Sequence, residues 1–419
     1  MSRFAYSVLL YLLAPLILLY LYVMRGNKQP AYRYHFAERL ALRLTHLPKH
    51  ALVFHCASVG EVLAAAPIIK KLLSSRDERL ILTCNTPTGR TQIQQQFGNS
   101  VQVCYLPLDF WHISRRFIRV LQPKLVCLFE TELWPNLIAA AQKNGCQTIL
   151  LNARLSAKSA QGYQRFAALS QAMLSQLSAV GCHSSTDGKR FVELGLDESK
   201  LTVTGSVKFD LQISDEDQQT VAELKALWPE RPVWVAGSTH PGEHEQVLAA
   251  HQQLLLIHPN ALLIIAPRHP EQFPLVASLI QQAGLHFCSR TAMQLTAHTQ
   301  VLLADTLGEL KRLYGAANIA YVGGSLIDRG GHNPLEAAAF AVGILSGPSY
   351  HNFAHIYPEL LALGGAKIVQ DSTALATQLA NLFNDAEACQ QLGQHAQRCL
   401  AANQGAEART LDLIYRHLE

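Results

Sequence analysis

The chain has 419 residues, of which 49% are apolar and 16% are charged, and its formal net charge is +4. A chain of this length exceeds one ordinary hydrophobic core, and its apolar content excludes a disordered protein, so we expect two domains. The small net charge gives no sign of the basic surface that binding of nucleic acid requires.

The first predicted element is an apolar helix over residues 4–24, a stretch without charged side chains. Its length suits a crossing of the hydrocarbon core of a membrane, and tyrosines flank it. A cleaved signal peptide and a helix lying in the interface are the alternatives. No small-residue cleavage pattern follows Met24, and the stretch lacks a polar face. We therefore predict a membrane anchor over residues 1–25.

Basic residues surround this helix, because residues 1–60 hold seven Lys or Arg and one Glu. Arg25, Lys28 and Arg33 follow the helix, whereas Arg3 alone precedes it. The positive-inside rule then predicts a single span with everything after residue 25 in the cytoplasm.

Beyond residue 50, short β-rich apolar runs alternate with longer amphipathic runs. This pattern is typical of parallel strands covered on both faces by helices, the doubly wound α/β fold. A polar stretch over residues 205–220 separates two such sets, so we predict Rossmann-like domains over 26–205 and 206–419 whose strand carboxyl ends face a cleft. Strands are predicted at 51–56, 79–84, 101–106, 124–130, 147–152, 177–182 and 200–205, and at 231–238, 261–267, 285–289, 300–305, 319–324, 341–347 and 365–370.

Several kinds of site are disfavoured by the motifs. The nine cysteines occur singly, which argues against a zinc site and against a disulfide framework. The glycine motifs of dinucleotide-binding folds and of phosphate-loop NTPases do not occur. His240 with His244, and His351 with His355, have a spacing that suits a metal, but neither pair has a convergent third ligand. We predict no metal and no cofactor.

Three predicted strands run into a Gly- or Pro-containing break and then into a helix whose first turn carries a carboxylate: Glu61, Glu243 and Glu336. Capping explains each of them locally. Ser58 and Glu61 in "HCASVGE" have the spacing of a capping box, and Asn333 is the expected N-cap of a helix with Pro334 first and Glu336 third. Three such helix starts at strand ends would also line a cleft with N–H groups that suit a phosphate or carboxylate ligand.

The glycines around the third helix start allow two interpretations. Gly323, Gly324, Gly330 and Gly331 could let the backbone approach a ligand closely, or they could simply form turns. We hold both interpretations open.

Four more polar residues are expected at strand ends. Arg268 and His269 end one strand, and there we expect a contact with an anion. Glu130 ends a buried run, so its carboxylate needs an ionic partner or a place in the cleft, and we favour the cleft. Lys208 lies at the predicted domain junction, within reach of that cleft.

Ordered motifs along almost the whole chain resemble one family, the 3-deoxy-D-manno-octulosonic acid (Kdo) transferases of lipopolysaccharide synthesis. The resemblance rests on "HCASVGE", "TPTG", "FETELWPN", "NARLS", "GSVKFD", "GSTHPGE", "APRHPE", "TLGEL" and "GGSLIDRGGHNPLEAA", which follow an apolar N-terminus.

This resemblance implies a GT-B fold and an inverting transfer of Kdo from CMP-Kdo to a lipid A precursor, lipid IVA, at the cytoplasmic face of the bacterial inner membrane. The lack of a metal-binding motif favours a metal-independent mechanism. It implies Glu61 as the general base, with Glu130 and Lys208 assisting. The residues that it assigns to CMP are Arg268, His269, Leu307, Gly308, Glu309, Asn333, Pro334, Leu335 and Glu336.

Two alternatives remain beside it: a GT-B enzyme that uses a UDP-sugar, and an inactive sugar-nucleotide-binding or scaffolding protein. The protonation of Glu61 is also open at this point. A helix N-terminus lowers the pKa of a carboxyl group, whereas burial or a nearby Glu130 raises it.

Overall fold

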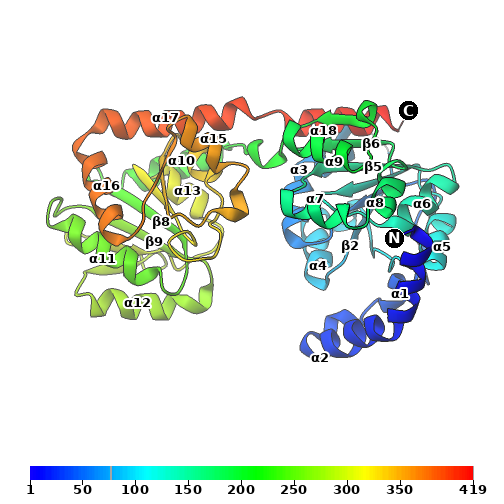
Figure 1. Cartoon of the computed structure of the whole chain (residues 1–419). Coiled ribbons are helices and arrows are strands. Elements are labelled where there is room, and N and C mark those ends of the chain that lie inside the picture. Colours follow the sequence, from blue (N-terminus) through cyan, green and yellow to red (C-terminus); the bar gives the residue numbers. More distant parts are fainter. Residues whose placement is uncertain (76–77, 419) are drawn as a thin grey trace. The chain divides into compact units, whose positions relative to one another are not determined.

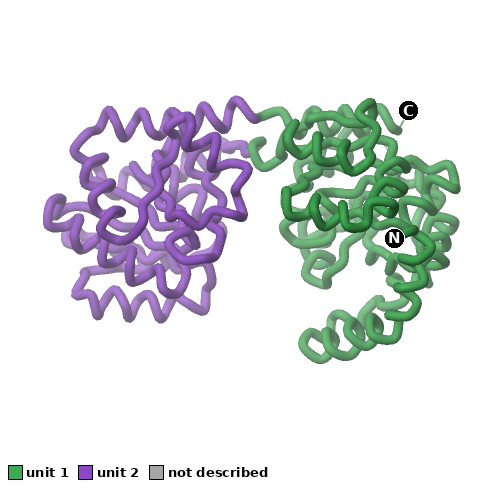
Figure 2. The backbone as a smooth tube through the Cα atoms, in the orientation of Figure 1, with its two compact units in different colours: residues 1–210, 404–419 green, residues 211–403 purple. Residues whose placement is uncertain are grey.

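The computed structural model describes residues 1–75 and 78–418. The chain folds as two compact units (Figure 2): unit 1 comprises Met1–Asp210 and the segment from Gln404 onward, and unit 2 comprises Leu211–Asn403. Each unit is built on its own parallel sheet. The GT-B fold predicted from the sequence is confirmed.

In the described part of unit 1, the strands form one seven-stranded sheet with the order β3-β2-β1-β4-β5-β6-β7. Every neighbouring pair is parallel, and β1 pairs with both β2 and β4, since Leu52 is opposite Leu80 on one side and Leu125 on the other. The chain order therefore reverses at β1, where doubly wound folds place their ligands. The strands are β1 Leu52–His55, β2 Leu80–Cys84, β3 Gln102–Tyr105, β4 Leu125–Phe129, β5 Gln147–Ala153, β6 Ala179–Cys182 and β7 Leu201–Val203.

Helices cover both faces of this sheet. Successive strand residues point to opposite faces, and the apolar side chains on both faces are buried under helices. Val53 joins the core under α5, α6, α8 and α9, whereas Leu52 and Phe54 join the core under α3, α4 and α18 (Figure 1). The helices are α3 Val59–Ser75, α4 Pro87–Phe97, α5 Trp111–Leu121, α6 Pro135–Lys143, α7 Ala157–Gln164, α8 Ala167–Leu174, α9 Ser185–Glu193 and α18 Ala406–Arg416.

Unit 2 repeats this plan over its described residues, with the strand order β10-β11-β9-β8-β12-β13-β14 and a reversal at β8. Helices α11, α12 and α16 pack on one face, and α13 packs on the other (Figure 1). The strands are β8 Val233–Thr239, β9 Leu262–Pro267, β10 Phe287–Ser289, β11 Val301–Leu303, β12 Ile319–Val322, β13 Gly343–Ser346 and β14 Ala366–Ile368. The helices are α10 Asp215–Lys225, α11 His244–Leu255, α12 Phe273–Gln282, α13 Leu310–Gly315, α14 Leu335–Ala339, α15 Tyr357–Ala362, α16 Ser372–Asn384 and α17 Ala386–Ala402.

The two units differ from the predicted domains at their ends. The sequence placed everything after residue 205 in the second domain, but the last helix, α18, belongs to unit 1. Its Leu411, Leu413 and Ile414 are buried in the core on one face of the unit 1 sheet. Arg409 on the same helix donates from Nε to the carbonyl oxygen of Thr204 at 2.8 Å. Burial of this apolar face explains why the helix returns to unit 1.

The N-terminal apolar segment is helical from Arg3 to Lys28: α1 Arg3–Leu18, a π-helical stretch Leu19–Arg25, and α2 Gly26–Lys28. By length and composition it could cross a membrane. Leu10, Ala14 and Ile17 are partly buried and pack against the core of unit 1. The segment is therefore part of unit 1 in this structure.

Candidate active site

Glu61 lies in the first turn of α3, directly after the carboxyl end of β1. Its carboxylate accepts hydrogen bonds from the backbone N–H of Ala57 at 2.8 Å and from the hydroxyl of Ser58 at 2.9 Å. The Ser58 oxygen in turn accepts from the N–H of Glu61 at 3.4 Å. The reciprocal cap predicted from the sequence is therefore present, with Ala57 as the backbone donor.

Burial decides the protonation of this carboxyl group. Glu61 is 9% exposed, and burial raises its pKa from 4.5 to about 7, although the hydrogen bonds from Ala57 and Ser58 oppose the shift. The charges of Glu130 and Glu132 raise the pKa further. A carboxyl group with a pKa near neutrality can take up a proton during a reaction, so the capping role leaves Glu61 able to act as a base.

Glu130 and Lys208 are the other two residues of unit 1 to which the resemblance assigns a role in catalysis. Glu130 follows β4 with a φ of 59°, a left-handed conformation that is uncommon outside glycine, and its N–H donates to the carbonyl oxygen of Leu151 at 2.8 Å. Lys208 belongs to a 3₁₀ turn, Val207–Phe209. Burial lowers the pKa of Lys208, and the charge of Glu130 opposes that effect. Glu130 therefore interacts electrostatically with both Glu61 and Lys208.

A network around Glu132 lies beside these residues, and the sequence assigned it no role. Trp134 donates from Nε1 to a carboxylate oxygen of Glu132 at 3.0 Å, and Nε2 of the buried His55 lies 3.4 Å from the same oxygen. Asn85 donates to that oxygen at 3.5 Å. His55 ends β1 and Asn85 directly follows β2, and the position at a strand end is the signal by which the sequence could have marked both residues.

In unit 2, a pocket of about 300 Å³ lies at the carboxyl ends of β8, β9 and β11. Of the residues predicted to bind a nucleotide, it is lined by Arg268, Leu307, Gly308, Asn333 and Glu336. Burial raises the pKa of Glu336, against a hydrogen bond from Asn333. The remaining lining residues are Ser238, Ala266, Pro267, Ala304, Thr306, Leu310, Leu313, Tyr314, His332 and Phe353.

The other predicted nucleotide ligands, His269, Glu309, Pro334 and Leu335, do not line this pocket. His269 is exposed, Glu309 accepts from Arg290 at 3.0 Å, and Leu335 is fully buried. The first residue of the helix α14 is Leu335, whereas the sequence predicted Pro334 as the first residue. Pro334 therefore directly precedes the helix and provides no side-chain cap. Asn333 still caps it, since its side-chain oxygen accepts from the N–H of Leu335 at 3.2 Å.

Two histidines extend the polar lining of the pocket. Nε2 of His240 lies 2.9 Å from Nε2 of His332, and their rings stack with centroids 5.1 Å apart. Burial lowers the pKa of His332 to about 4, and His240 and Arg268 lower it further. The negative charge of a phosphate in this pocket would offset the repulsion from His240 and Arg268 and would so favour the charged imidazolium of His332.

Glu243 corrects one expectation from the sequence, which grouped it with the carboxylates of the cleft. It is fully buried, and its carboxylate accepts from the Tyr321 hydroxyl at 2.6 Å and from the N–H groups of Gly324, Ser325 and Leu326 at 2.7, 3.1 and 3.1 Å. Glu243 therefore holds the loop after β12 instead of facing a ligand.

Gly323, in the same loop, is a structural glycine. A Cβ there would lie 2.7 Å from the carbonyl oxygens of Gly237 and Ser238, so a larger residue would force β8 and β12 apart. At Gly323 the close approach is therefore to the chain's own backbone and not to a ligand.

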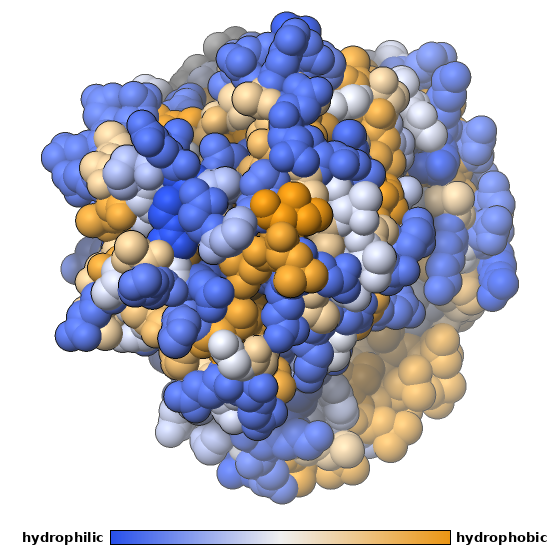
Figure 3. Space-filling view, turned by 90° about the vertical axis from the view of Figure 1, so that its left-hand side faces the viewer, coloured by the Kyte–Doolittle hydropathy of each residue, from blue (hydrophilic) through white to orange (hydrophobic). Residues whose placement is uncertain are grey.

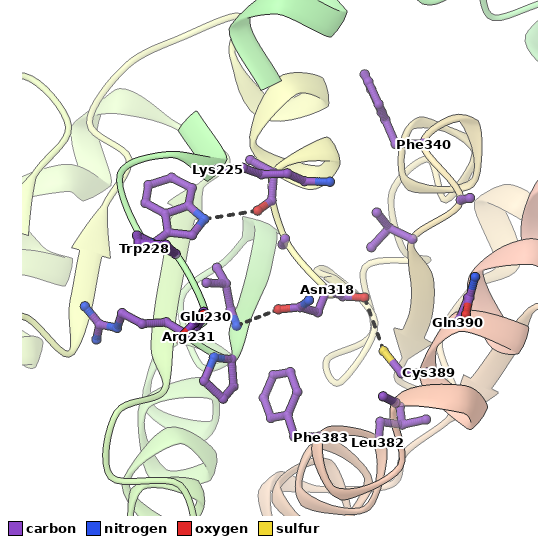
Figure 4. Close-up of a pocket in the computed structure, with 18 residues that line it drawn as sticks. Lys225, Trp228, Glu230, Arg231, Asn318, Phe340, Leu382, Phe383, Cys389 and Gln390 are labelled. Carbon is purple, nitrogen blue, oxygen red and sulfur yellow. Dashed lines mark hydrogen bonds between the residues drawn. The ribbon is translucent and has the colours of Figure 1, made fainter. Parts of the chain in front are cut away.

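A larger pocket of about 580 Å³ lies elsewhere in unit 2 (Figure 4). It is lined by Val233, Asn318 and Val342, which lie at the amino ends of their strands or just before them, and by Trp228 and Phe383. The Trp228 indole donates to the carbonyl oxygen of Ala316 at 3.2 Å. Doubly wound sheets bind ligands at the carboxyl ends of their strands, so the smaller pocket is the better candidate for a nucleotide.

Among residues 1–75 and 78–418, no group of three or more His, Cys, Asp or Glu side chains is arranged to hold a metal ion.

Comparison with known proteins gives a consistent picture. Residues 34–211 match the model of a family described as 3-deoxy-D-manno-octulosonic-acid transferase (kdotransferase). The chain is 40% identical to a 3-deoxy-D-manno-octulosonic acid transferase of Haemophilus influenzae, with 100% of this chain and 99% of the relative covered. It is 35% identical to the Bordetella pertussis enzyme of the same name, with 86% of each chain covered. A glycosyltransferase structure from Rickettsia africae matches 88% of this chain and 98% of its own with a TM-score of 0.59; at 13% identity it shows the fold alone.

Proposed function

The chain belongs to the Kdo transferase family, and from that premise we propose that it is an inverting enzyme that transfers Kdo from CMP-Kdo to lipid IVA. Kdo transfer in lipopolysaccharide synthesis by a glycosyltransferase follows from the family. The donor, the acceptor and the stereochemistry are our proposal. Glu61 supports the catalytic part of the proposal: it lies in the first turn of α3, it is 9% exposed, and its pKa, raised to about 7, suits a general base.

In the proposed reaction, Glu61 takes the proton of an acceptor hydroxyl as that oxygen bonds to the anomeric carbon of Kdo. The bond from the anomeric carbon to the phosphate oxygen breaks, and CMP leaves with the electron pair. Attack opposite to the leaving group inverts the anomeric configuration. At neutral pH a substantial fraction of Glu61 is ionised and ready to accept the proton.

Glu130 and Lys208 assist in this proposal. Lys208 would stabilise the negative charge that develops at the transition state, and the charge of Glu130 helps to keep its ammonium protonated despite burial. Glu130 also helps to keep the pKa of Glu61 near neutrality.

We assign CMP to the pocket of about 300 Å³ in unit 2, with Arg268 as the cationic ligand of its phosphate. Leu307, Gly308, Asn333 and Glu336 line the same pocket and complete the proposed contacts. His269, Glu309, Pro334 and Leu335 are proposed to act from outside the lining, through neighbouring groups or the backbone.

We further propose a reaction that needs no metal ion. The guanidinium of Arg268 and the imidazole of His332 can offset the charge on departing CMP in this pocket, and the side-chain amide of Asn333 can donate a hydrogen bond to it. The site of action would be the cytoplasmic face of the bacterial inner membrane, with the apolar N-terminal helix as the anchor.

The test is an assay with CMP-Kdo generated in situ, lipid IVA and a chelator. We expect product with the inverted anomeric configuration at an undiminished rate. Preference for a uridine-linked sugar, retention of configuration, or a strict need for added divalent metal would each refute the corresponding part of the proposal.

A further inference from the structure

The apolar helix α1 is fixed to unit 1 by polar contacts on one of its faces. Tyr6 donates from its hydroxyl to Asp109 at 3.1 Å, and Ser7 donates to the side-chain oxygen of Asn136 at 3.0 Å. The ring of Tyr11 stacks on His112 with centroids 5.6 Å apart. Asn136 lies in α6, His112 lies in α5, and Asp109 directly precedes α5. Figure 1 shows α1 beside both of these helices.

The main partner of this face, Asp109, is rigidly held. It is 5% exposed and accepts from the N–H groups of Asn136 and Leu137 at 2.9 and 2.8 Å and from the hydroxyl of Ser114 at 3.0 Å. Tyr6 completes its set of donors. Removing α1 would take away one donor from a buried carboxylate and would uncover the core contacts of Leu10, Ala14 and Ile17.

The far end of the helical segment is also tied back to unit 1. Arg25 donates from Nη1 to the Tyr32 hydroxyl at 3.4 Å, and Arg33 donates from Nε to the carbonyl oxygen of Tyr22 at 3.1 Å. The ring of Tyr22 packs edge-on against Phe36, with centroids 5.2 Å apart. The segment is therefore held at both ends, by α5 and α6 at its start and by the segment after residue 30 at its end.

The opposite face of the same helix is apolar and exposed. Phe4, Val8, Leu12 and Leu16 lie four residues apart and so fall on one face of the helix, and exposed apolar residues continue through the π-helical stretch. We call the exposed apolar residues of this face the stripe. The exposed fractions are 79% for Phe4, 42% for Val8, 46% for Leu9, 73% for Leu12, 38% for Leu13, 61% for Leu16, 51% for Leu19, 39% for Val23 and 56% for Met24. No comparable run of apolar residues is exposed elsewhere in the described residues. In unit 2 exposed apolar residues are few, and the face shown in Figure 3 is mostly hydrophilic.

From these contacts we infer that α1 does not cross the membrane: it stays on unit 1 and inserts its exposed stripe into the surface of an anionic lipid bilayer. This inference rests on the proposed membrane location and replaces the predicted span. A spanning helix is surrounded by lipid at the bilayer centre and would have to leave Asp109, Asn136 and the core of unit 1. An in-plane helix keeps these contacts and still buries its apolar face.

The charges around the stripe fit anionic headgroups. Residues 1–37 contain Arg3, Arg25, Lys28 and Arg33 and no acidic residue. The neighbouring helix α5 adds Arg115, Arg116 and Arg119, again without an acidic residue, and its first residue, Trp111, is 47% exposed. Basic residues and an exposed Trp beside an apolar stripe are the composition of a membrane-surface helix. A second copy of this chain would offer the same positive charge and is therefore disfavoured as the occupant.

Vesicle binding tests the surface itself. The full chain is floated with vesicles of phosphatidylethanolamine and phosphatidylglycerol, without substrate. We expect Leu12→Asp together with Leu16→Asp to weaken partitioning by roughly tenfold or more. The matched control is Leu256→Asp with Ile257→Asp, two residues of unit 2 that are 86% and 58% exposed, and it should bind like the parent. Equal binding of both variants, or self-association through α1 without binding to vesicles, would overturn the inference.

Labelling of the N-terminus tests the topology. Cys288→Ser and Cys389→Ser remove the two cysteines that are not buried, and the exposed Ser2 or the exposed Glu245 is changed to cysteine. In inside-out inner-membrane vesicles, an impermeant maleimide should label Ser2→Cys and Glu245→Cys alike. Labelling of Ser2→Cys only from the opposite side would overturn the in-plane helix and leave the proposed membrane location and enzyme activity intact. Absence of the protein from membranes would refute the location as well.

Discussion

The substitution Glu61→Gln separates the capping role of this side chain from its proposed role as a base. Glutamine keeps a side-chain oxygen that can accept from the N–H of Ala57, but it cannot take a proton from an acceptor hydroxyl. General-base assistance is worth about 10²- to 10⁴-fold. We expect kcat to fall by about that factor while the variant stays folded.

The raised pKa of Glu61 also predicts the sign of the change in stability. A carboxyl group whose pKa is higher in the folded state stabilises the fold at low pH, and that contribution is lost as the pH rises through the folded value. The change from 4.5 to about 7 corresponds to about 3 kcal/mol, lost between these two pH values. Glu61→Gln lacks this loss, so its free energy of unfolding relative to the parent should increase across the same window.

Initial rates measured with CMP-Kdo and lipid IVA as a function of pH complete the test. Because the ionised carboxylate is the active form, the rate of the parent enzyme should fall about tenfold for each pH unit below about 7. Asp187→Asn is the matched control. Asp187 likewise caps a helix, accepting from the hydroxyl of Ser184 at 2.7 Å and from the N–H of Leu155 at 3.0 Å, and its loss should leave kcat within a few-fold.

A rate for Glu61→Gln within a few-fold of the parent would refute the reasoning, and Glu61 would then be a helix cap only. The same conclusion would follow if Asp187→Asn lowered kcat as strongly as Glu61→Gln, because loss of a buried cap would then explain both effects.

Three further outcomes are expected. Arg268→Ala should weaken CMP binding by about 10- to 100-fold in titration calorimetry, since it removes a charged donor from the proposed phosphate site, and Arg268→Lys should recover part of this affinity. Glu243→Ala should lower the free energy of unfolding by about 2 to 4 kcal/mol in urea, because it leaves buried N–H groups unpaired, whereas the exposed Glu245→Ala should change it little. Excess chelator should leave the transfer rate unchanged, and loss of activity that added divalent metal restores would count against the metal-free mechanism.

The sheets of this protein are readable from the sequence because parallel strands buried on both faces are continuous apolar runs. The run at residues 124–130 became β4, and the run at 261–267 became β9. The sequence did not predict that α18 packs on the sheet of unit 1. Its amphipathic pattern predicts a helix with one buried face, but the pattern does not say which of two sheets that face will cover.

The candidate site was predictable to the extent that strand ends could be located. Glu61 and Glu130 are far apart in the sequence, yet each follows a strand of the same sheet next to the reversal at β1. Glu243 shows the limit of this reasoning. It has the same local setting as Glu61, a helix start after a central strand, but Tyr321 and the loop after β12 enclose it completely. Such enclosure depends on residues about eighty positions away, and no local pattern encodes it.

Because α18 packs on unit 1, the order in which the two units can fold during synthesis is affected. Every residue of unit 2 has been synthesised by the time Asn403 leaves the ribosome, whereas unit 1 still lacks the helix that covers Leu151 and Ala179 on its sheet. The inserted unit can therefore fold first, although the larger part of unit 1 precedes it. Until α18 has been synthesised, the apolar face of the unit 1 sheet that Leu413 and Ile414 cover stays exposed. A chain that stops before residue 406 is therefore prone to aggregate and becomes a target for chaperones and proteases.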